Sequence, residues 1–308
     1  MICVVGDLVE DVVVRLEGAP GAPPAWGTDT AATITRSRGG SAANVAEFAA
    51  RLHGASRFVG RVGDDDVGRA LVARLRDAGV DARVERAGCT GTIVVIVHPG
   101  GERTMLSDRG ASTAFAAPPT GWLDGVDVLH VPAYSLAGGA VADTARRMAD
   151  DAHAAGVRVS ADASSTGLIA SLGAREAVAR ILALRPGVLL CNAEEADALG
   201  AEDAVARGAL PLLVVKRGAA PTRVVAGAVA GGGAAAGDPS SAPVVRVDEH
   251  AVPPVAGVVD TTGAGDAFAA GFLAPWAAGA AIDHCVRAAH AAAARVLRSP
   301  GATLGDAP

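Results

Sequence analysis

The sequence predicts an α/β protein with a large, mostly parallel sheet and a second, smaller β-sheet, and three observations carry this prediction. Half of the 308 residues are apolar and 19% are charged, which supplies material for a large core. From residue 126 onward, short apolar runs alternate regularly with helical patterns, which indicates a parallel sheet covered by helices on both faces. Earlier β-rich segments do not fit this alternation, so we expect a small sheet that protrudes from the main body.

The first third of the chain combines β-rich segments with two helices. Short apolar runs that end at glycine are typical of strands, and an apolar face repeated every three to four residues is typical of a helix. On these grounds we expect strands over 1–5, 11–16, 30–35 and 57–62, helices over 41–53 and 64–78, and a hairpin of 92–98 with 102–107. Asp64 is the expected N-cap of the second helix, because its carboxylate can accept free backbone N–H groups.

The rest of the chain carries the regular alternation. Strands are expected over 126–131, 157–161, 188–191 and 212–216, and two Ala-rich helices over 264–279 and 282–297. The segment 226–243 is rich in Ala, Gly, Ser and Pro, and we interpret it as a hairpin tip or surface loop rather than a linker between domains. Residues 1–308 are therefore expected to form a single domain.

Composition and charge argue against several functional classes. The 27 basic and 33 acidic residues give a formal net charge of −6, and an acidic protein is poorly suited to nonspecific binding of nucleic acid or anionic membranes. Three Trp, one Tyr and five Phe offer few rings for stacking on bases. Among the basic residues only Lys216 is a lysine, which makes that position conspicuous.

The cysteines and the start of the chain bear on the cellular environment. Cys3, Cys89, Cys191 and Cys285 form no CxxC pair, so we interpret them as small apolar core residues in a reducing compartment rather than as a disulfide frame or a zinc site. The first residues, MICVVGDLVEDVVV, contain acids and no basic stretch, unlike a signal peptide. The longest uncharged apolar stretch near the C-terminus, 267–282, is shorter than the ~20 residues that span a bilayer. We expect a cytoplasmic protein.

The most informative segment is a glycine turn over 260–268, with the sequence Asp-Thr-Thr-Gly-Ala-Gly-Asp-Ala-Phe. Backbone N–H groups at the helix start beside Gly263 and Gly265 can converge on an anion, and the helix dipole adds to the attraction. Asp266 would repel a bound phosphate, but its carboxylate is useful if it takes the proton from a hydroxyl that attacks phosphorus. An ordinary glycine turn with Asp266 as a helix cap is the alternative.

Other nucleotide-binding and catalytic motifs do not match. A Walker A loop needs Ser or Thr after its lysine, and Lys216 is followed by Arg217. A dinucleotide GxGxxG would need glycine at Phe268, and there is no GxSxG nucleophile elbow. An oxidoreductase is therefore weakly supported.

Two motifs together resemble a known family. The segment 260–268 resembles the C-terminal signature of the ribokinase-like (PfkB) carbohydrate kinases, and the segment 38–46, Arg-Gly-Gly-Ser-Ala-Ala-Asn-Val-Ala, looks like that family's N-terminal Gly-Gly motif. The resemblance extends in order from Gly6 to about Gly305. It implies a ribokinase-like α/β core with a small β-sheet lid, built from about 12–37 and 89–111, that closes over the acceptor and excludes water.

The resemblance assigns catalytic and acceptor-binding residues, which are Asp266, Gly263, Ala264 and Gly265 for catalysis and Asp11, Gly39, Gly40, Asn44 and Arg109 for the acceptor. Asp266 would take the hydroxyl proton, and the N–H groups of the turn would stabilise the transferred phosphoryl group. Asp11 can accept two hydroxyl hydrogen bonds, which suits a polyol, or it can be a solvated strand end. Arg103 and Arg109 lie on the expected lid hairpin and its exit. Arg109 can reach the acceptor from there, and the alternative is that these arginines are simply exposed to solvent. Ser41 stands where several relatives carry Lys.

The same resemblance assigns the nucleotide and cation residues, which are Asn192, Lys216, Gly218 and His290 for the nucleotide, Glu195 for Mg²⁺ through water, and Asp260 and Thr262 for a monovalent cation such as K⁺. Asn192 and Glu195 resemble the family's NxxE motif, with plain helix capping as the alternative. Lys216 ends an expected strand, and ligands of open parallel sheets bind beyond such strand ends. His290 borders the adenine in relatives, or is simply a histidine on an amphipathic helix. Gly305 replaces a hydroxyl residue of the cation loop, which leaves K⁺ dependence open.

Together the matches predict an ATP-dependent kinase that transfers the γ-phosphoryl group to a primary hydroxyl of a sugar or sugar-like molecule, with Mg²⁺ as its metal. A nucleoside kinase of the same family, of pseudouridine or adenosine type, and a non-catalytic sugar or nucleotide binder are the alternatives. Because the exposed lid face often pairs between subunits in the family, we expect a homodimer. We expect neither a nucleic acid nor a membrane as a partner.

Overall fold

A large and a small β-sheet organise the protein. The computed structural model describes residues 1–18, 23–100, 102–227 and 245–305. Within these residues the large sheet has nine strands, in the spatial order β13 (Val245–His250), β12 (Ala220–Gly227), β11 (Leu212–Arg217), β10 (Val188–Asn192), β9 (Arg158–Asp162), β8 (Val128–Pro132), β1 (Ile2–Val5), β4 (Ser56–Val62) and β5 (Val80–Arg86). The strands from β11 to β5 run parallel, and β12 pairs antiparallel with both of its neighbours, β11 and β13. The expected mostly parallel sheet is confirmed.

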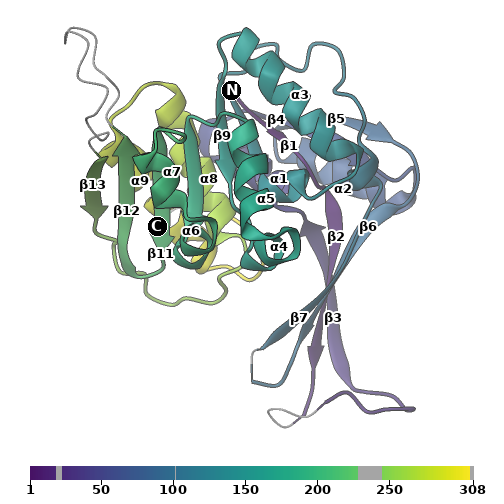
Figure 1. The fold of residues 1–308 in the computed structure, drawn as a ribbon. Helices are drawn as coiled ribbons and strands as arrows, with labels where there is room; N and C mark the ends of the chain where they lie inside the picture. Colours follow the sequence, from purple (N-terminus) through teal and green to yellow (C-terminus); the bar gives the residue numbers. More distant parts are fainter. Residues whose placement is uncertain (19–22, 101, 228–244, 306–308) are drawn as a thin grey trace, which may run out of the picture.

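Helices cover both faces of the large sheet (Figure 1). One face carries α1 (Ser41–His53), α2 (Asp66–Asp77), α8 (Ala264–Ala277) and α9 (Ile282–Leu297), and the other carries α3 (Ala140–Ala154), α4 (Thr166–Leu172), α5 (Ala174–Ala183), α6 (Ala193–Leu199) and α7 (Ala201–Ala206). Two short 3₁₀ helices, η1 (Ala111–Ala114) and η2 (Ala133–Leu136), follow β7 and β8 respectively. Large apolar side chains such as Phe48 and Met148 are fully buried in the two layers, at about 1.5–3 kcal/mol each.

The small sheet projects away from the main body, as Figure 1 shows. Its strands lie in the order β3 (Ala32–Gly39), β2 (Val9–Leu16), β6 (Thr90–Val97) and β7 (Arg103–Gly110). Residues alternate between the two faces of a strand, so Asp11, Ile93 and Ser107 share one face in register and Val12, Val94 and Leu106 share the other. The second, smaller sheet expected from the early β-rich segments is present.

Several local expectations need correction. The N-cap of α2 is Asp65, not Asp64, because the Asp65 carboxylate accepts the backbone N–H of Gly68 at 2.7 Å and is held by Thr90. Cys89 is exposed, because it precedes β6 in a loop, whereas the other three cysteines are buried as expected. The expected loop at 226–243 overlaps the end of β12, and its residues 228–243 lie outside the described residues.

The carboxyl ends of the parallel strands place polar groups at one edge. Asp162, Asn192 and Lys216 lie at or near the ends of β9, β10 and β11, and register pairs Asn192 with Lys216. Helices α1 and α8 pack against each other, and both begin at this edge after a glycine with positive φ. A Cβ on Gly40 would collide with the carbonyl oxygen of Asp7, so glycine allows α1 to start directly against the loop after β1.

Within the described residues, no helix combines the length and the apolar character that crossing a membrane requires.

Candidate active site

Asp266 lies in the first turn of α8, where residues of α1 hold both of its oxygens. The Ser41 hydroxyl donates to Oδ1 and the Asn44 amide donates to Oδ2, each at 2.7 Å. Burial raises the pKa of Asp266 to about 6, although the two hydrogen bonds oppose this change. The nearby carboxylate of Asp162 raises the pKa further. Asp266 is therefore mostly ionised at neutral pH and is a stronger base than an ordinary carboxylate.

The glycine turn before Asp266 leaves backbone donors available. Gly263 has φ +79°, a conformation that favours glycine. A Cβ at this position would also lie only 2.7 Å from the Cβ of Ala302, so both the backbone conformation and the packing require glycine. Ala264 N donates to Thr261 O at 3.2 Å, and Ala267 N donates to Gly263 O at 2.9 Å. Gly265 lies in the first turn of α8, so its N–H group has no acceptor within the helix and lies at the positive end of the helix dipole. The turn can therefore hold an anion beside the Asp266 carboxylate.

Asp11 lies on the acceptor side of Asp266, at the base of the small sheet. Burial raises the pKa of Asp11 to about 6, with Arg38 opposing the change and Asp266 adding to it. Gly39 lies directly against Asp11, since a Cβ at Gly39 would collide with the Asp11 carboxylate. Two acidic groups with raised pKa values thus face one small region, and hydroxyl groups are suitable ligands for both.

Arg109 is the other acceptor-side candidate, and the structure pairs it with Asp7. Arg109 Nε and Nη2 donate to the two oxygens of Asp7 at 2.7 and 2.8 Å. Asn44, besides its bond to Asp266, accepts from Arg38 Nη1 at 2.7 Å, and Arg38 also donates to Glu47 at 2.9 Å. The arginine charges on this side are therefore already matched by carboxylates.

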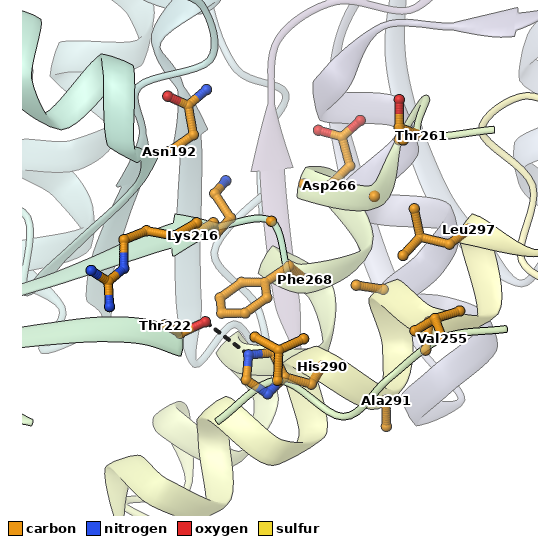
Figure 2. A pocket seen from close by; sticks show the side chains of 18 of the residues that line it. Asn192, Lys216, Thr222, Val255, Thr261, Asp266, Phe268, His290, Ala291 and Leu297 are labelled. Atoms are coloured by element: carbon orange, nitrogen blue, oxygen red, sulfur yellow. Dashed lines mark hydrogen bonds between the residues drawn. The ribbon is translucent and has the colours of Figure 1, made fainter. Parts of the chain in front are cut away.

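A cavity of about 1110 Å³ opens on the opposite side of Asp266. Figure 2 shows Asn192, Lys216 and Asp266 grouped toward one part of it, and Phe268 and His290 farther along. Its lining includes Gly263, Ala264, Gly265, Gly218, Glu195, Val255, Ala291 and Leu297. A polar end next to the glycine turn and an apolar remainder suit phosphates and a heterocyclic base respectively.

Lys216 lies between the glycine turn and Asp162. Its Nζ donates to Asp162 Oδ2 at 2.8 Å and lies 3.4 Å from the Cβ position of Gly265. Burial alone would lower the pKa of Lys216, but the Asp162 charge and hydrogen bond raise it, so the ammonium stays protonated. A fixed positive charge therefore lies next to the anion-binding turn.

Asn192 and Glu195 form a reciprocal capping box at the start of α6. Asn192 Oδ1 accepts from Glu195 N, and Glu195 Oε2 accepts from Asn192 N, both at 2.8 Å. Burial raises the pKa of Glu195, and the charge of Asp162 raises it further. Helix capping is thus present, and the remaining Glu195 oxygen and the Asp162 carboxylate are hard oxygen ligands of the kind that Mg²⁺ prefers.

His290 lies at the far end of the cavity. Its Nε2 shares a hydrogen bond of 2.8 Å with Thr222 Oγ1, and its ring meets Phe268 edge-on at 5.7 Å (Figure 2). Burial lowers the pKa of His290, with His250 adding to the effect, so the imidazole is neutral at neutral pH. The uncharged imidazole of His290 and the ring of Phe268 together form one wall of this end of the cavity.

Asp260 and Thr262 lie on the other side of the glycine turn. Asp260 Oδ1 accepts from Thr262 N at 2.9 Å and from Thr262 Oγ1 at 2.8 Å, and Oδ2 accepts from Gly301 N at 3.1 Å. Burial alone would raise the pKa of Asp260, but these donors, joined by Arg103, hold it well below its ordinary value. Asp260 is therefore a fixed negative charge.

The structure brings the expected site residues into adjoining groups around Asp266. Several contacts were not foreseen from the sequence, among them the hydrogen bond from Ser41 to Asp266 and the ion pair between Asp162 and Lys216. The first had a signal, because Ser41 and Asn44 are three residues apart at the start of a helix and so share one face. Among the described residues, no group of three or more His, Cys, Asp or Glu residues is arranged to hold a metal ion by itself.

Comparison with known proteins decides the family. Residues 1–308 match the family described as pfkB family carbohydrate kinase. This chain belongs to that family. The kinase is therefore an ATP-dependent phosphotransferase by family, and the fold and enzyme class expected from its two motifs are confirmed.

The relatives of this kinase are named for different phosphate acceptors. The kinase is 31% identical over 300 residues to an ATP-dependent ribose-1-phosphate kinase of Halopiger xanaduensis, covering 95% of this chain and 90% of the relative. It is 33% identical over 297 residues to a fructokinase of Klebsiella pneumoniae, covering 90% and 84%. The solved adenosine kinase of Sinorhizobium meliloti has a TM-score of 0.80 at 22% identity, covering 98% of this chain and 94% of the other. That last likeness shows the shared fold.

Proposed function

We propose that this kinase transfers the γ-phosphoryl group of ATP to a primary hydroxyl of an uncharged sugar or sugar-like acceptor, with Asp266 as the general base. The observation that carries the proposal is the position of Asp266, which α1 holds by two hydrogen bonds between the acidic region near Asp11 and the anion-binding turn. An acceptor hydroxyl at this point would meet a base on one side and a phosphoryl group on the other.

The residues around Asp266 have separate tasks in this reaction. Asp11 and Asn44 orient the acceptor, and Asp266 removes the proton of the attacking hydroxyl as the oxygen–phosphorus bond forms. The N–H groups of Gly263, Ala264 and Gly265 stabilise negative charge on the transferred group, and Ala264 N would exchange its bond to Thr261 O for this contact. The bond between the γ-phosphorus and its bridging oxygen breaks, and ADP leaves with the electron pair and the negative charge on that oxygen.

The nucleotide is held by the cavity on the other side of the turn. Lys216, kept protonated by Asp162, contacts the phosphates, and Asn192 and Gly218 border them. His290 and Phe268 form the wall against which the adenine packs. Glu195 would hold Mg²⁺ through water, and the metal, when bound, neutralises charge on the β- and γ-phosphates.

The charges on the acceptor side favour an uncharged acceptor over a sugar phosphate. The Nε and Nη2 groups of Arg109 donate to Asp7, and Arg38 donates to Glu47 and Asn44. Asp11 and Asp266 add two further carboxylates to the same region. A phosphate on the acceptor would compete with Asp7 for the charge of Arg109 and would lie near these acids.

An acceptor panel tests the proposed function. ADP formation is measured with neutral sugars, sugar phosphates and nucleosides, with Asp266→Asn as the matched inactive control. Neutral sugars are expected to give kcat/KM values at least about tenfold above those of sugar phosphates, a difference of about 1.4 kcal/mol. Preference for a sugar phosphate would overturn the acceptor class, and preference for a nucleoside would favour the family's other activity. ADP formation that never depends on an acceptor would overturn the kinase mechanism.

We also propose that two copies of the chain pair through the outer face of the small sheet. Ile34 and Leu106 are 60% and 55% exposed on that face, and Val12, Val14 and Val94 share it in register. Exposed apolar side chains gathered on one face of a sheet are typical of an interface. Sedimentation of the protein should show a dimer that Leu106→Asp converts to a monomer, and a monomeric wild type would contradict the proposal.

A further inference from the structure

Arg103 begins β7 at the far tip of the small sheet and reaches back to the loop before the glycine turn. Its Nη2 donates to Asp260 Oδ1 at 3.0 Å, and its Nη1 donates to Thr262 Oγ1 at 2.9 Å. The Asp260 side chain is 9% exposed and that of Arg103 40% exposed. A residue of the small sheet therefore completes the surroundings of a largely buried carboxylate on the large body.

Asp260 is the point at which three segments meet. It binds the backbone of Thr262, which precedes the turn, and the backbone of Gly301, and Ala302 then packs directly against Gly263. With Arg103 bound as well, the tip of the small sheet, the glycine turn and the 301–302 segment share one charged centre. A change at this centre is transmitted over three residues of chain to the amides that face the phosphoryl group.

The family resemblance implies a monovalent cation at Asp260 and Thr262, and the residues present do not fit one. Asp260 Oδ1 already accepts from two groups of Thr262 and from the guanidinium of Arg103. A cation at the same oxygens would lie against a fixed positive charge, so it could enter only if Arg103 left. The guanidinium carries the charge that such a cation would supply, and it is tethered to the small sheet.

We propose that Arg103 is a positioning residue that replaces the monovalent cation at the Asp260 loop and couples the seating of the small sheet over the acceptor to the geometry of the glycine turn. The proposal rests on the proposed function for its catalytic consequence. β7 is attached to the large body at both ends of one face, by Arg103 to Asp260 and by Arg109 to Asp7. The two attachments are six residue steps apart along the strand, a span of about 20 Å.

Arg15 provides a matched control for Arg103. It lies on the same inward face of the small sheet, in the same cross-strand row, because Val97 pairs with Arg15 on β2 and with Arg103 on β7. Arg15 is exposed and has no ion pair among the described residues. Either substitution removes one positive charge from the same cross-strand position of the small sheet, but only Arg103 contacts the Asp260 loop.

The experiment compares wild type, Arg103→Ala, Arg103→Lys and Arg15→Ala in KCl, NaCl and choline chloride at equal ionic strength. For wild type and Arg15→Ala, we expect kcat and KM to agree within about twofold in the three salts. For Arg103→Ala, we expect kcat to fall about tenfold or more in choline chloride, and to recover in part with KCl or with guanidinium at tens of millimolar. Arg103→Lys should retain most of the activity in every salt.

Thermal unfolding gives a readout that needs no turnover. Arg103→Ala should unfold at a higher temperature in KCl than in choline chloride, because K⁺ binds the folded loop, and wild type should show no such difference. Activation of wild type and Arg103→Ala by K⁺ to the same extent would overturn the proposal. So would identical behaviour of Arg103→Ala and Arg15→Ala in every salt. If no acceptor is phosphorylated, the proposed function fails, and the unfolding temperatures still decide whether Arg103 replaces the cation.

Discussion

Asp260 and Asp266 lie on opposite sides of the same glycine turn, and their surroundings move their pKa values in opposite directions. Asp260 is buried too, but three donors from Thr262 and Gly301 and the charge of Arg103 lower its pKa. Asp266 has two neutral donors, Ser41 and Asn44, and burial raises its pKa to about 6. Asp266 is the more deeply buried of the two, and Asp260 has more donors and a charged partner, so burial and donors together separate the two carboxylates.

The difference assigns the two carboxylates different purposes. A carboxylate surrounded by donors, as at Asp260, is a weak base and a strong structural anchor. A carboxylate that is costly to keep ionised, as at Asp266, is a poor anchor and a better base. Stability and basicity are therefore divided between neighbouring residues of one segment, and the division can be tested by altering each in turn.

The largest effect is expected from Asp266→Asn. The substitution removes the base, so kcat should fall by about 10²–10⁴. The folded pKa of about 6 lies above the ordinary 3.8, so the stabilisation by the protonated form is complete below 3.8 and is lost as the pH rises through 6. The neutral amide avoids that loss at pH 7 and should raise the free energy of unfolding, by at most about 3 kcal/mol. Near-normal turnover in a folded variant would rule out Asp266 as the base.

Asp260→Ala should have the opposite profile, with a loss of stability and a smaller loss of rate. The substitution leaves buried donors of Thr262 and Gly301 without an acceptor, which should cost about 2–3 kcal/mol in the free energy of unfolding. The rate should fall about tenfold through displacement of the turn. The folded pKa is depressed, so the stabilisation is present above 3.8 and is lost as the pH falls below that value, where wild type and variant should converge. Equal stability of the two proteins at pH 7 would contradict the anchor.

The fold was largely predictable from the sequence because its local patterns agree with its tertiary structure. The helix at 41–53 has the expected bounds, since Gly40 and Gly54 end its apolar periodicity on both sides. Strand β5 was not expected, because its alternating charged residues, as in Asp81 and Arg83, conceal an edge strand of a parallel sheet. β12 and β13 likewise alternate polar and apolar residues at the opposite edge.

The candidate site was less predictable than the fold. The motifs pointed to Asp266, Gly263 and Asn44, because those residue types at those spacings suit phosphoryl transfer. Pairings between distant segments had no local signal: Lys216 with Asp162, Arg109 with Asp7 and Arg103 with Asp260. Such pairs depend on which strand ends and loops the topology brings together. Because 26 of the 27 basic residues are arginine, composition cannot show which arginines form these pairs.

The pH dependence of the rate sharpens the comparison without a change at either carboxylate. Asp266 and Asp11 both have pKa values of about 6, and both must be ionised in the proposed reaction, Asp266 to take the hydroxyl proton and Asp11 to accept hydrogen bonds from the acceptor hydroxyls. We expect kcat/KM to fall below pH 6, more steeply than the tenfold per pH unit of a single ionisation. Asp11→Asn should keep the midpoint near 6 and reduce the slope to that of one proton. A rate that stays constant down to pH 5 would exclude both groups from the reaction.

The smallest effect is expected at Ser41, and its direction is the informative part. The Ser41 hydroxyl favours the ionised form of Asp266, so Ser41→Ala should raise the pKa of Asp266 and move the acidic limb of kcat/KM to higher pH, by about one unit if the hydrogen bond to the carboxylate has an ordinary strength. Ser41→Lys places a cation at the same point and should move the limb to lower pH, because an adjacent positive charge favours the carboxylate. The two substitutions change the same position with opposite signs, so a general loss of structure cannot produce both movements. If the limb moved the same way in both variants, or in neither, the titrating group would not be the carboxylate that Ser41 contacts.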